Sequence, residues 1–514
     1  MTTGAARLAG QGDRSPALAL LASAWRRSGL AEADRPILVI FVVMFIGAWI
    51  SRCIIAPDLP LWLDETWTGA IAGQPTWRAT IEQIRLDANA PLYYLVMHAW
   101  TGLFGLSNGA LRMPSMLFSL ATPLLILASR VEGLRLDDRL ALAALVTVWL
   151  EGLIQSSEAR CYTLLTLLAT AQLLAFARLM AAPTTRRAAI WAGLGSLVIL
   201  THYQAIMLGA VEGFIYLAVH HVRAIRTWPA ALAYAPAFAV LAWHWPVLVQ
   251  FARPEVAWYP LVTTSTLEAV APFVASSWWL YPLPGAGLLF MAWRAFRRRP
   301  MQGGPLHLWL AAIGALISLC IVVGVGWFRP SFTIRYVTAF MPGVMLLLVL
   351  GARALQPAFP GAVSGLMLMA AMHSAQWSTD VAGRLRNPYT YEAASRDLLA
   401  TRPTRLVFSW DHPAQQVETP GQYAEVGGFF FRRAGSPARV TAVMLKPQQD
   451  PSQALLDQAR EPGAVILWLY DTQVRNTLAA SYPPRITELD PSFGCRNYGR
   501  GRIGVLACAR SWRR

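Results

Sequence analysis

Two adjacent carboxylates, Asp64 and Glu65, stand in the segment Leu63-Asp64-Glu65-Thr66, directly after a short apolar run. A carboxylate that is held near a substrate can accept the proton of a hydroxyl group and so act as a general base. The same pair also suits the start of a helix, where an N-cap Asp and a first-turn Glu complement the helix dipole. The residue types leave both interpretations open.

Charged and aromatic residues also stand at the ends of several apolar segments, on the side of the membrane where few arginines are expected. A guanidinium group can bind phosphate through two parallel hydrogen bonds, so these residues predict a phosphate site. The alternative is local ion pairing, for example between Glu158 and Arg160. For Arg112 the alternative is an ion pair with a carboxylate of the neighbouring loop. The candidate binding residues are Arg112, Glu158, Arg160, His202, Tyr203, Arg335 and Tyr336.

Glu212 is a further ionisable residue, in the middle of the apolar segment 204–220. An ionisable side chain at such a depth is a candidate for function. The alternative is a hydrogen bond to a neighbouring helix, and the sequence favours neither interpretation.

A carboxylate-bearing loop opposite a rim of arginines suits the transfer of a group from a lipid phosphate. The carboxylate would act as the general base on an acceptor hydroxyl group. The arginines would stabilise the negative charge that builds on the departing phosphate. The lipid tail would lie between helices, and the sugar head would meet the outer loop.

The composition predicts that such a site belongs to a membrane protein. The chain has 514 residues, of which 55% are hydrophobic and only 14% are charged. A soluble chain carries roughly 25% charged residues, so the shortfall indicates extensive contact with lipid. The net charge is +16, almost all from arginine, with Lys446 as the one lysine. Because the basic residues are scattered between apolar segments, nucleic acid is not expected as a partner.

Apolar segments of the length needed to cross a membrane, about 20 residues, recur along the chain. Basic loops follow every second segment, which predicts a cytoplasmic N-terminus and an outer location for residues 378–514. The fold class predicted is an α-helical polytopic membrane protein. The eleven predicted spans cover residues 36–56, 111–129, 140–155, 161–179, 188–203, 204–220, 229–249, 270–293, 306–328, 336–355 and 360–377.

Three parts of the chain therefore differ in kind. Residues 1–35 are predicted to be a cytoplasmic tail, and residues 36–377 the transmembrane domain. Residues 57–110 form a long first outer loop, in which Thr76–Asp87 and Pro91–Gly105 are predicted to be interfacial helices.

Residues 378–514 alternate between helix-like and strand-like patterns, which predicts a small extracytoplasmic α/β domain. Outside the cytoplasm, a disulfide between Cys495 and Cys508 is plausible, closing a short hairpin.

The motifs also follow one another in a recognisable order. They are Leu63-Asp64-Glu65-Thr66, Ala90-Pro91-Leu92-Tyr93-Tyr94, His98, Leu111-Arg112-Met113-Pro114-Ser115, Glu158-Ala159-Arg160-Cys161-Tyr162, Thr201-His202-Tyr203 and Arg335-Tyr336. With this order, residues 36–355 resemble bacterial GT-C glycosyltransferases, in particular those similar to protein O-mannosyltransferases and the lipid A aminoarabinose transferase. The chain departs from the usual pattern at Asn89-Ala90-Pro91, where His-Pro-Pro or Pro-Pro is more common.

The resemblance implies a polyprenyl-phosphate-linked sugar as donor, inversion at the anomeric carbon, and a glycan, lipid or protein of the cell envelope as acceptor. It implies that Asp64 and Glu65 are the catalytic acids, with Asp64 as the base. It implies positions near the donor phosphate or the loop for Arg112, Glu158, Arg160 and Arg335. Some members of the family need a divalent metal, and the sequence leaves that requirement open.

Two other functions fit part of the pattern. A multi-spanning transporter would explain the many spans and Glu212, although its charges are expected near the membrane midplane rather than in an outer loop. A non-enzymatic protein of envelope assembly would explain the C-terminal domain as a partner-binding module.

Overall fold

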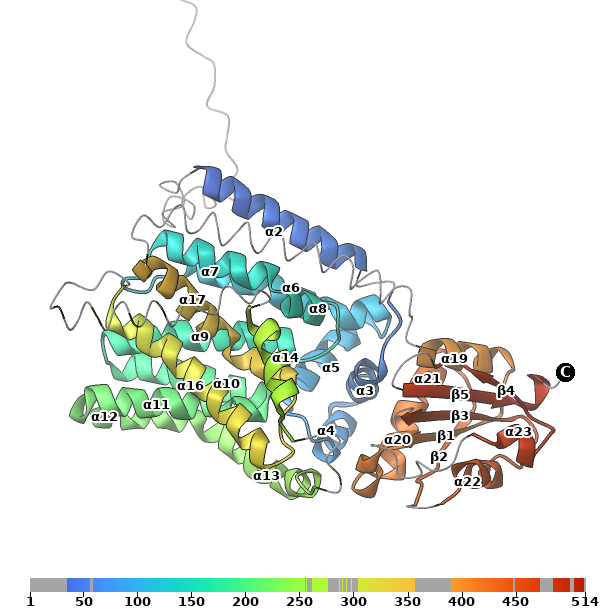
Figure 1. Cartoon of the computed structure of the whole chain (residues 1–514). Coiled ribbons are helices and arrows are strands. Elements are labelled where there is room, and N and C mark those ends of the chain that lie inside the picture. The colour runs from blue at the N-terminus through green and yellow to red at the C-terminus, as the bar shows by residue number, and fades with distance from the viewer. Residues whose placement is uncertain are drawn as a thin grey trace, which may run out of the picture.

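A bundle of long helices and a smaller sheet domain at one end of it make up the protein, with the helices of the outer loop between them (Figure 1). The computed structural model describes residues 35–55, 59–254, 256, 261–275, 286, 289, 293, 297, 304–355, 390–446, 449–471, 484–499 and 503–512. The predicted tail up to residue 34, the predicted span at 360–377 and the predicted domain boundary near residue 378 lie outside the described residues, as does most of the predicted span at 270–293.

Five helices of the described part are long and apolar enough to cross a membrane. They are α6 (Asn108–Ala128), α9 (Tyr162–Ala181), η3 with α13 (Trp228–Tyr234 and Ala235–Phe251), α16 (Leu306–Phe328), and η5 with α17 (Ile334–Phe340 and Met341–Leu355). A sixth arises if α7 (Leu136–Val148) and α8 (Leu150–Ser156) form one span, which bends by 58°. The fold is therefore a polytopic helical bundle, and the number eleven stays a prediction.

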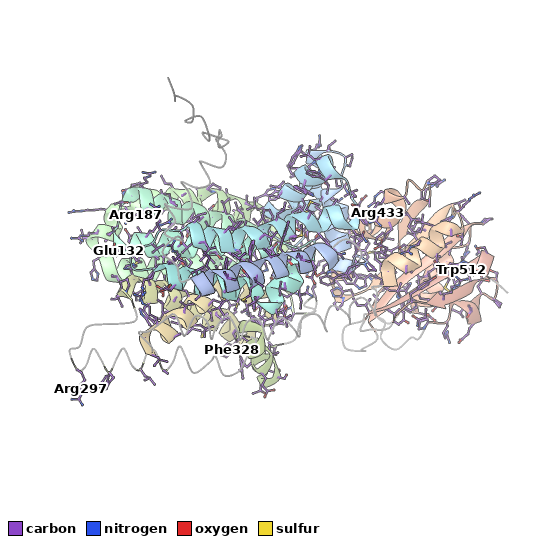
Figure 2. All side chains as sticks on the ribbon, turned by 90° about the horizontal axis from the view of Figure 1, so that it is seen from above. Glu132, Arg187, Arg297, Phe328, Arg433 and Trp512 are labelled. Atoms are coloured by element: carbon purple, nitrogen blue, oxygen red, sulfur yellow. A yellow bond between two sulfur atoms is a disulfide. The ribbon has the colours of Figure 1, made fainter. Side chains whose placement is uncertain are left out.

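Further helices complete the bundle. They are α2 (Arg35–Ile55), α10 (Thr185–Thr201), the 3-10 turn η2 (Tyr203–Ala205), α11 (Ile206–His220), α12 (Val222–Arg226) and α14 (Thr264–Ala275). Figure 2 places Arg187 and Arg297, which belong to two of the predicted inner loops, at the end of the bundle farthest from Trp512 in the C-terminal domain. These two loops and the C-terminal domain thus lie at opposite ends of the bundle.

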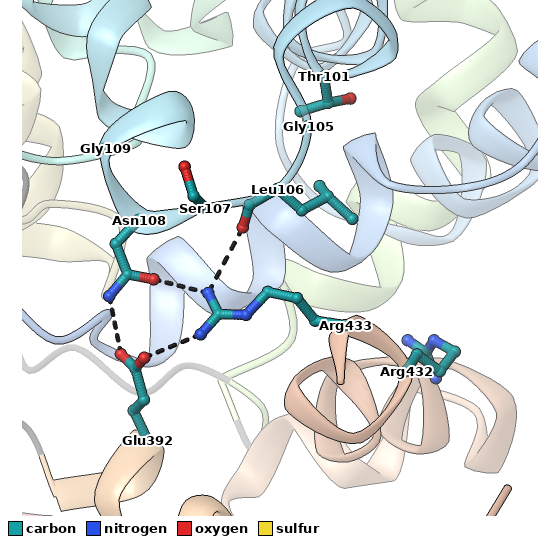
Figure 3. A pocket seen from close by; sticks show the side chains of 9 residues that line it. All are labelled: Thr101, Gly105, Leu106, Ser107, Asn108, Gly109, Glu392, Arg432 and Arg433. Carbon is teal, nitrogen blue, oxygen red and sulfur yellow. Dashed lines mark hydrogen bonds and ion pairs between the residues drawn. The ribbon is translucent and has the colours of Figure 1, made fainter. Parts of the chain in front are cut away.

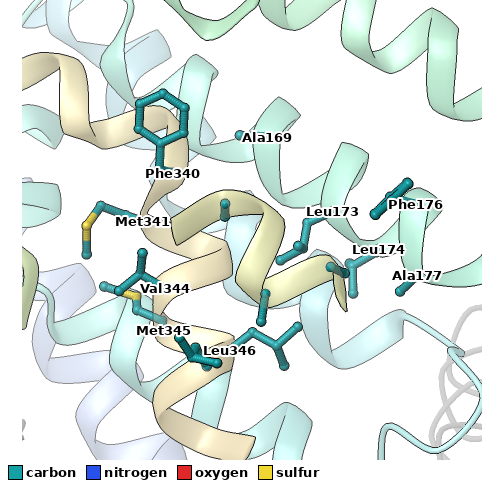
Figure 4. Packing of buried hydrophobic residues seen from close by; sticks show 14 of the residues in the cluster. Ala169, Leu173, Leu174, Phe176, Ala177, Phe340, Met341, Val344, Met345 and Leu346 are labelled. Carbon is teal, nitrogen blue, oxygen red and sulfur yellow. The ribbon is translucent and has the colours of Figure 1, made fainter. Parts of the chain in front are cut away.

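The centre of the bundle is the span made by η5 and α17. Inside the protein, 94% of its most apolar stretch is buried, against 11% for the span Trp228–Phe251, which therefore presents its side chains to the surroundings. A Cβ atom at Gly343 would lie 2.2 Å from the Cβ of Ala315, so only glycine lets α17 approach α16 this closely. On another side, apolar residues from Phe340 to Leu346 pack near Leu173 and other residues of α9 (Figure 4).

The first outer loop folds into three helices, α3 (Leu63–Ala72), α4 (Trp77–Leu86) and α5 (Leu92–Phe104). The hydroxyl of Thr76 caps α4 by accepting a hydrogen bond from the Ala79 amide, 3.2 Å away. Both helices predicted in this loop are confirmed, within one residue at each end. The pair Asp64 and Glu65 does lie at the start of a helix, which was one of its two interpretations, but Trp62 is the N-cap and both carboxylates lie in the first turn of α3.

The C-terminal domain is a five-stranded sheet in the order β2-β1-β3-β5-β4. Strands β2 (Arg439–Ala442), β1 (Arg405–Asp411) and β3 (Ala464–Asp471) are parallel, while β5 (Ile503–Ala509) runs antiparallel to both β3 and β4 (Gly494–Asn497). The predicted α/β character of this region is thus confirmed. Cys495 and Cys508 face each other across β4 and β5 and form a disulfide.

Helices cover both faces of this sheet. On the face toward the bundle lie α19 (Thr390–Ala400), α20 (Pro420–Gly427) and α21 (Phe429–Arg433), whose apolar side chains share one core with those of α3 and α5. On the other face lie α22 (Pro451–Gln458) and α23 (Ile486–Leu489). The shared core joins the C-terminal domain to the outer loop, because buried apolar area on both sides is removed from water together.

Candidate active site

Asp64 stands between two arginines at the start of α3. Its carboxylate Oδ2 lies 3.5 Å from Nη1 of Arg335 and 3.9 Å from Nη2 of Arg160. Arg160 also donates a hydrogen bond from Nη1 to the backbone oxygen of Asp64, at 3.3 Å. The Asp64 side chain is 35% exposed, so the carboxylate remains open to a reactant.

Irregular backbone presents both arginines to Asp64. Arg160 belongs to the short turn between α8 and α9, and Arg335 to the 3-10 helix η5, whose N-cap Thr333 accepts a hydrogen bond from the Arg335 amide. The guanidinium of Arg335 also lies 4.5 Å from the ring centre of Trp62, a cation–π contact that limits its freedom. Residues 96 and 271 positions from Asp64 are thereby brought to one carboxylate.

Glu65 lies one residue further on and faces inward. Arg112 binds it with both prongs of its guanidinium, from Nε to Oε1 at 2.7 Å and from Nη2 to Oε2 at 2.6 Å. The backbone amides of Ala159 and Trp62 donate to the same carboxylate, at 2.8 Å and 3.2 Å. Burial raises the pKa of Glu65, and the hydrogen bond and charge of Arg112 oppose that rise.

Arg112 is equally engaged. Besides Glu65, its guanidinium donates to the backbone oxygens of Leu59 and Pro60. The ion pair expected between Arg112 and a carboxylate of the loop is confirmed. These contacts direct the guanidinium of Arg112 toward the backbone of the loop rather than toward Arg160 and Arg335, which lie beside Asp64.

The aromatic rings of Tyr162 and His202 lie near Arg160. The ring of His202 lies 4.7 Å from that of Tyr336 and 6.3 Å from that of Tyr162. Glu158 is near enough to interact electrostatically with Arg335. Glu158, Arg160 and Arg335 therefore lie close to Asp64, as does Tyr162. His202 and Tyr336 extend this group from the side of Tyr162.

Tyr203 points elsewhere. Its hydroxyl lies 2.7 Å from Nδ1 of His244 on α13. Asp87 is close to both residues and is itself buried, with the Tyr94 hydroxyl donating to it at 2.7 Å and the Asn89 amide at 3.0 Å. Neither Asp87 nor His244 was predicted as a site residue from the sequence. The available signal for Asp87 was its position between a predicted amphipathic helix and the Pro91 motif.

Glu212 is bound within the bundle. Its Oε2 accepts hydrogen bonds from Gln172 of α9 at 2.7 Å and from Trp191 of α10 at 2.6 Å. The hydrogen bond to a neighbouring helix, one of its two interpretations, is confirmed. In the described part of the chain, no group of three or more His, Cys, Asp or Glu side chains is arranged to hold a metal ion.

A cleft of about 900 Å³ opens at the junction of the outer loop and the C-terminal domain (Figure 3). Its wall runs from the end of α5 to the start of α6 and continues on α19 and α21. The polar side chains in it include Asn108, Glu392 and Arg433, which bind one another across the domain junction.

The bundle, the outer-loop helices and the sheet domain together make the GT-C fold of membrane glycosyltransferases, and solved structures share it. ArnT from Cupriavidus metallidurans in the apo state superposes with a TM-score of 0.57 and 12% identity, covering 92% of this chain and 98% of that chain. ArnT from the same organism bound to undecaprenyl phosphate superposes with a TM-score of 0.50 and 13% identity over the same shares. No protein-family model and no curated protein matches the chain. At this level of identity the likeness establishes the fold.

Proposed function

We propose that this protein is an inverting glycosyltransferase, which moves a hexose or pentose from a polyprenyl-phosphate-linked donor to an acceptor in the cell envelope. The observation that carries the proposal is the partly exposed Asp64 carboxylate between the guanidinium groups of Arg160 and Arg335. The fold supports it, since ArnT, which has the same fold, has been solved with undecaprenyl phosphate bound.

The arginines bind the donor phosphate in this proposal. In the free protein they have Asp64 as a partner, and a lipid phosphate offers them a stronger, bidentate one. When Arg160 and Arg335 bind the phosphate, the Asp64 carboxylate loses its two ion pairs and stands within a few Å of the phosphate. Glu158, His202, Tyr336 and Tyr162 border this position and surround the sugar phosphate.

The reaction then needs one base and one electrostatic site. Asp64 takes the proton of the acceptor hydroxyl as its oxygen forms a bond to the anomeric carbon. The bond from that carbon to the phosphate oxygen breaks on the opposite face, and the polyprenyl phosphate leaves with the electron pair, stabilised by Arg160 and Arg335. Attack opposite the leaving group inverts the anomeric centre.

Glu65 and Arg112 support this site indirectly, without a role in the chemical step. Their ion pair fixes the first turn of α3, which carries Asp64. We assign them to positioning the catalytic loop, with Asp64 as the base of the predicted acid pair.

The orientation follows from the charge pattern and is part of the proposal. The N-terminus lies in the cytoplasm, and the outer loop and the C-terminal domain lie outside. The disulfide between Cys495 and Cys508 supports an oxidising location for that domain.

The decisive experiment replaces Asp64 with Asn, which keeps the shape of the side chain and removes its basicity. We expect turnover of a polyprenyl-phosphate-linked sugar to fall by about 100-fold or more, while the protein still inserts and folds. Glu82→Gln is the matched control, because Glu82 is an exposed acid of the same outer loop, paired with Arg78. Analysis of envelope lipids in a deletion strain identifies the donor as the lipid-linked sugar that accumulates. Unchanged envelope glycan in a strain carrying only Asp64→Asn would refute the role of Asp64.

A further inference from the structure

A carboxylate of the C-terminal domain binds the backbone that leads into the candidate catalytic helix. Glu392, in the first turn of α19, accepts a hydrogen bond at Oε2 from the Leu61 amide at 3.0 Å. The same oxygen accepts from the Asn108 amide group at 3.0 Å, and Oε1 accepts from Arg433 at 2.9 Å. Arg433 in turn donates to Asn108 at 2.6 Å, which closes a ring of three side chains (Figure 3).

The same stretch of backbone is bound from the bundle side by Arg112. That guanidinium donates to the carbonyl oxygens of Leu59 and Pro60, while Glu392 accepts from the amide of the next residue, Leu61. Two fully paired charged groups from separate parts of the fold thus bind three consecutive residues. Asp64 follows three positions after Leu61, in the first turn of α3.

The C-terminal domain makes further contacts along the outer loop. Gln422 of α20 donates to the Leu86 carbonyl at 2.8 Å, and Gln74 donates to Glu425 at 2.9 Å. These contacts bind the part of the loop that follows Asp64 in the sequence, and they hold α3 and α4 to the C-terminal domain. Glu392 differs from them because it acts before Asp64, on the segment that sets where α3 begins.

We propose that Glu392 is a positioning residue for the transfer reaction, through which the docked C-terminal domain sets the place of Asp64. The proposal rests on the proposed function, since it assigns a kinetic role to a contact outside the site itself. A displacement of about 1 Å at a reacting group costs up to about 100-fold in rate. Glu392 touches neither Arg160 nor Arg335 in any contact described above, so the donor site is expected to stay intact without it.

Three substitutions separate positioning from a general role in domain stability. Glu392→Ala removes every contact of the carboxylate. Glu392→Gln keeps an oxygen at the right reach for the Leu61 amide but gives up the charge that pairs with Arg433. Glu392→Asp keeps the charge and draws it back by one methylene. Glu461→Ala is the control, because Glu461 forms an ion pair with Arg405 at 2.8 Å elsewhere in the same domain.

Two measurements are made on the full-length protein in detergent or nanodiscs. The first is turnover with a polyprenyl-phosphate-linked sugar. We expect Glu392→Ala to lower kcat by about 10- to 100-fold, with KM for the donor within about twofold of the parent value. The second is amide hydrogen exchange over residues 59–66, which we expect to become faster in Glu392→Ala and to stay unchanged in Glu461→Ala.

The order of the other two variants decides between the mechanisms. Positioning through Leu61 predicts that Glu392→Gln retains more activity and more exchange protection than Glu392→Asp. A role confined to the Arg433 ion pair predicts the reverse order and would overturn the proposal, and this comparison still decides if Glu392→Ala does not fold. Parent-like kcat and exchange in Glu392→Asp would also overturn it. Faster exchange in a protein whose parent transfers no sugar would keep the contact and reject the proposed function instead.

Discussion

Glu65 and Arg112 form a two-pronged ion pair in the protein interior, 2.6 Å at its shorter contact, between the first turn of α3 and the first turns of α6. Breaking a buried pair by removing one partner leaves an uncompensated charge. We expect Arg112→Met to destabilise the protein by about 3–5 kcal/mol, measured by thermal or denaturant unfolding. Arg78→Met is the control, since its pair with Glu82 is exposed and should matter little. Equal losses in the two variants would contradict this account.

The arginines next to Asp64 should govern affinity for the donor. Lysine keeps the positive charge at these positions but cannot bind a phosphate through two parallel hydrogen bonds. We expect Arg335→Lys and Arg160→Lys each to raise KM for the lipid donor by about tenfold. Arg496→Lys, on strand β4 of the C-terminal domain, serves as the control. An unchanged KM in both variants would remove the phosphate from this part of the site.

Glu418 should make the stability of the protein depend on pH. Its carboxyl group is buried, and burial raises its pKa from 4.5 to about 8, against a smaller opposing effect of the Tyr423 hydroxyl. An acid with a raised folded-state pKa contributes stability that is complete below its unfolded pKa and is lost as the pH rises through the folded value. The melting temperature is therefore expected to fall as the pH rises from about 4.5 to about 8, and to level off above that value.

Glu418→Gln tests the assignment of that slope. The amide cannot ionise, so the variant should show a flatter dependence on pH and should melt above the parent protein at pH 9. Glu488→Gln in α23 controls for the loss of one negative charge in the same domain. A slope that persists undiminished in Glu418→Gln would assign the dependence on pH to another group.

The disulfide between Cys495 and Cys508 should stabilise the C-terminal domain. It closes a loop with a sequence separation of 13, for which chain entropy predicts a contribution of about 3 kcal/mol. We expect Cys495→Ser with Cys508→Ser to lower the midpoint of unfolding of the domain, measured by limited proteolysis at increasing temperature. Cys320→Ser is the control, because Cys320 is an exposed free thiol of α16. A parent-like midpoint in the double variant would contradict the prediction.

Much of the fold was predictable because its signals are local. The two helices predicted after Thr76 and Pro91 appear where their apolar spacing puts them. The alternation of helices and strands predicted for the C-terminal domain likewise agrees with its described elements. Less of the bundle was predictable. The break between α7 and α8 falls inside one predicted apolar segment, and no local residue type predicts a bend there.

The sequence by itself determined that the chain is a membrane protein and predicted a carboxylate-bearing outer loop, because burial in lipid and loop charge are properties of composition and order. It could name Asp64, Glu65 and the arginines as candidates, but it could not divide them into roles. Only the tertiary structure assigns these residues to separate roles. Asp64 and Glu65 are adjacent, yet the helical turn points one toward Arg160 and Arg335 and the other into the interior toward Arg112, because successive residues of a helix face directions about 100° apart. The contact from Glu392 to Leu61 spans 331 positions of sequence, and only the docking of the C-terminal domain could bring it about.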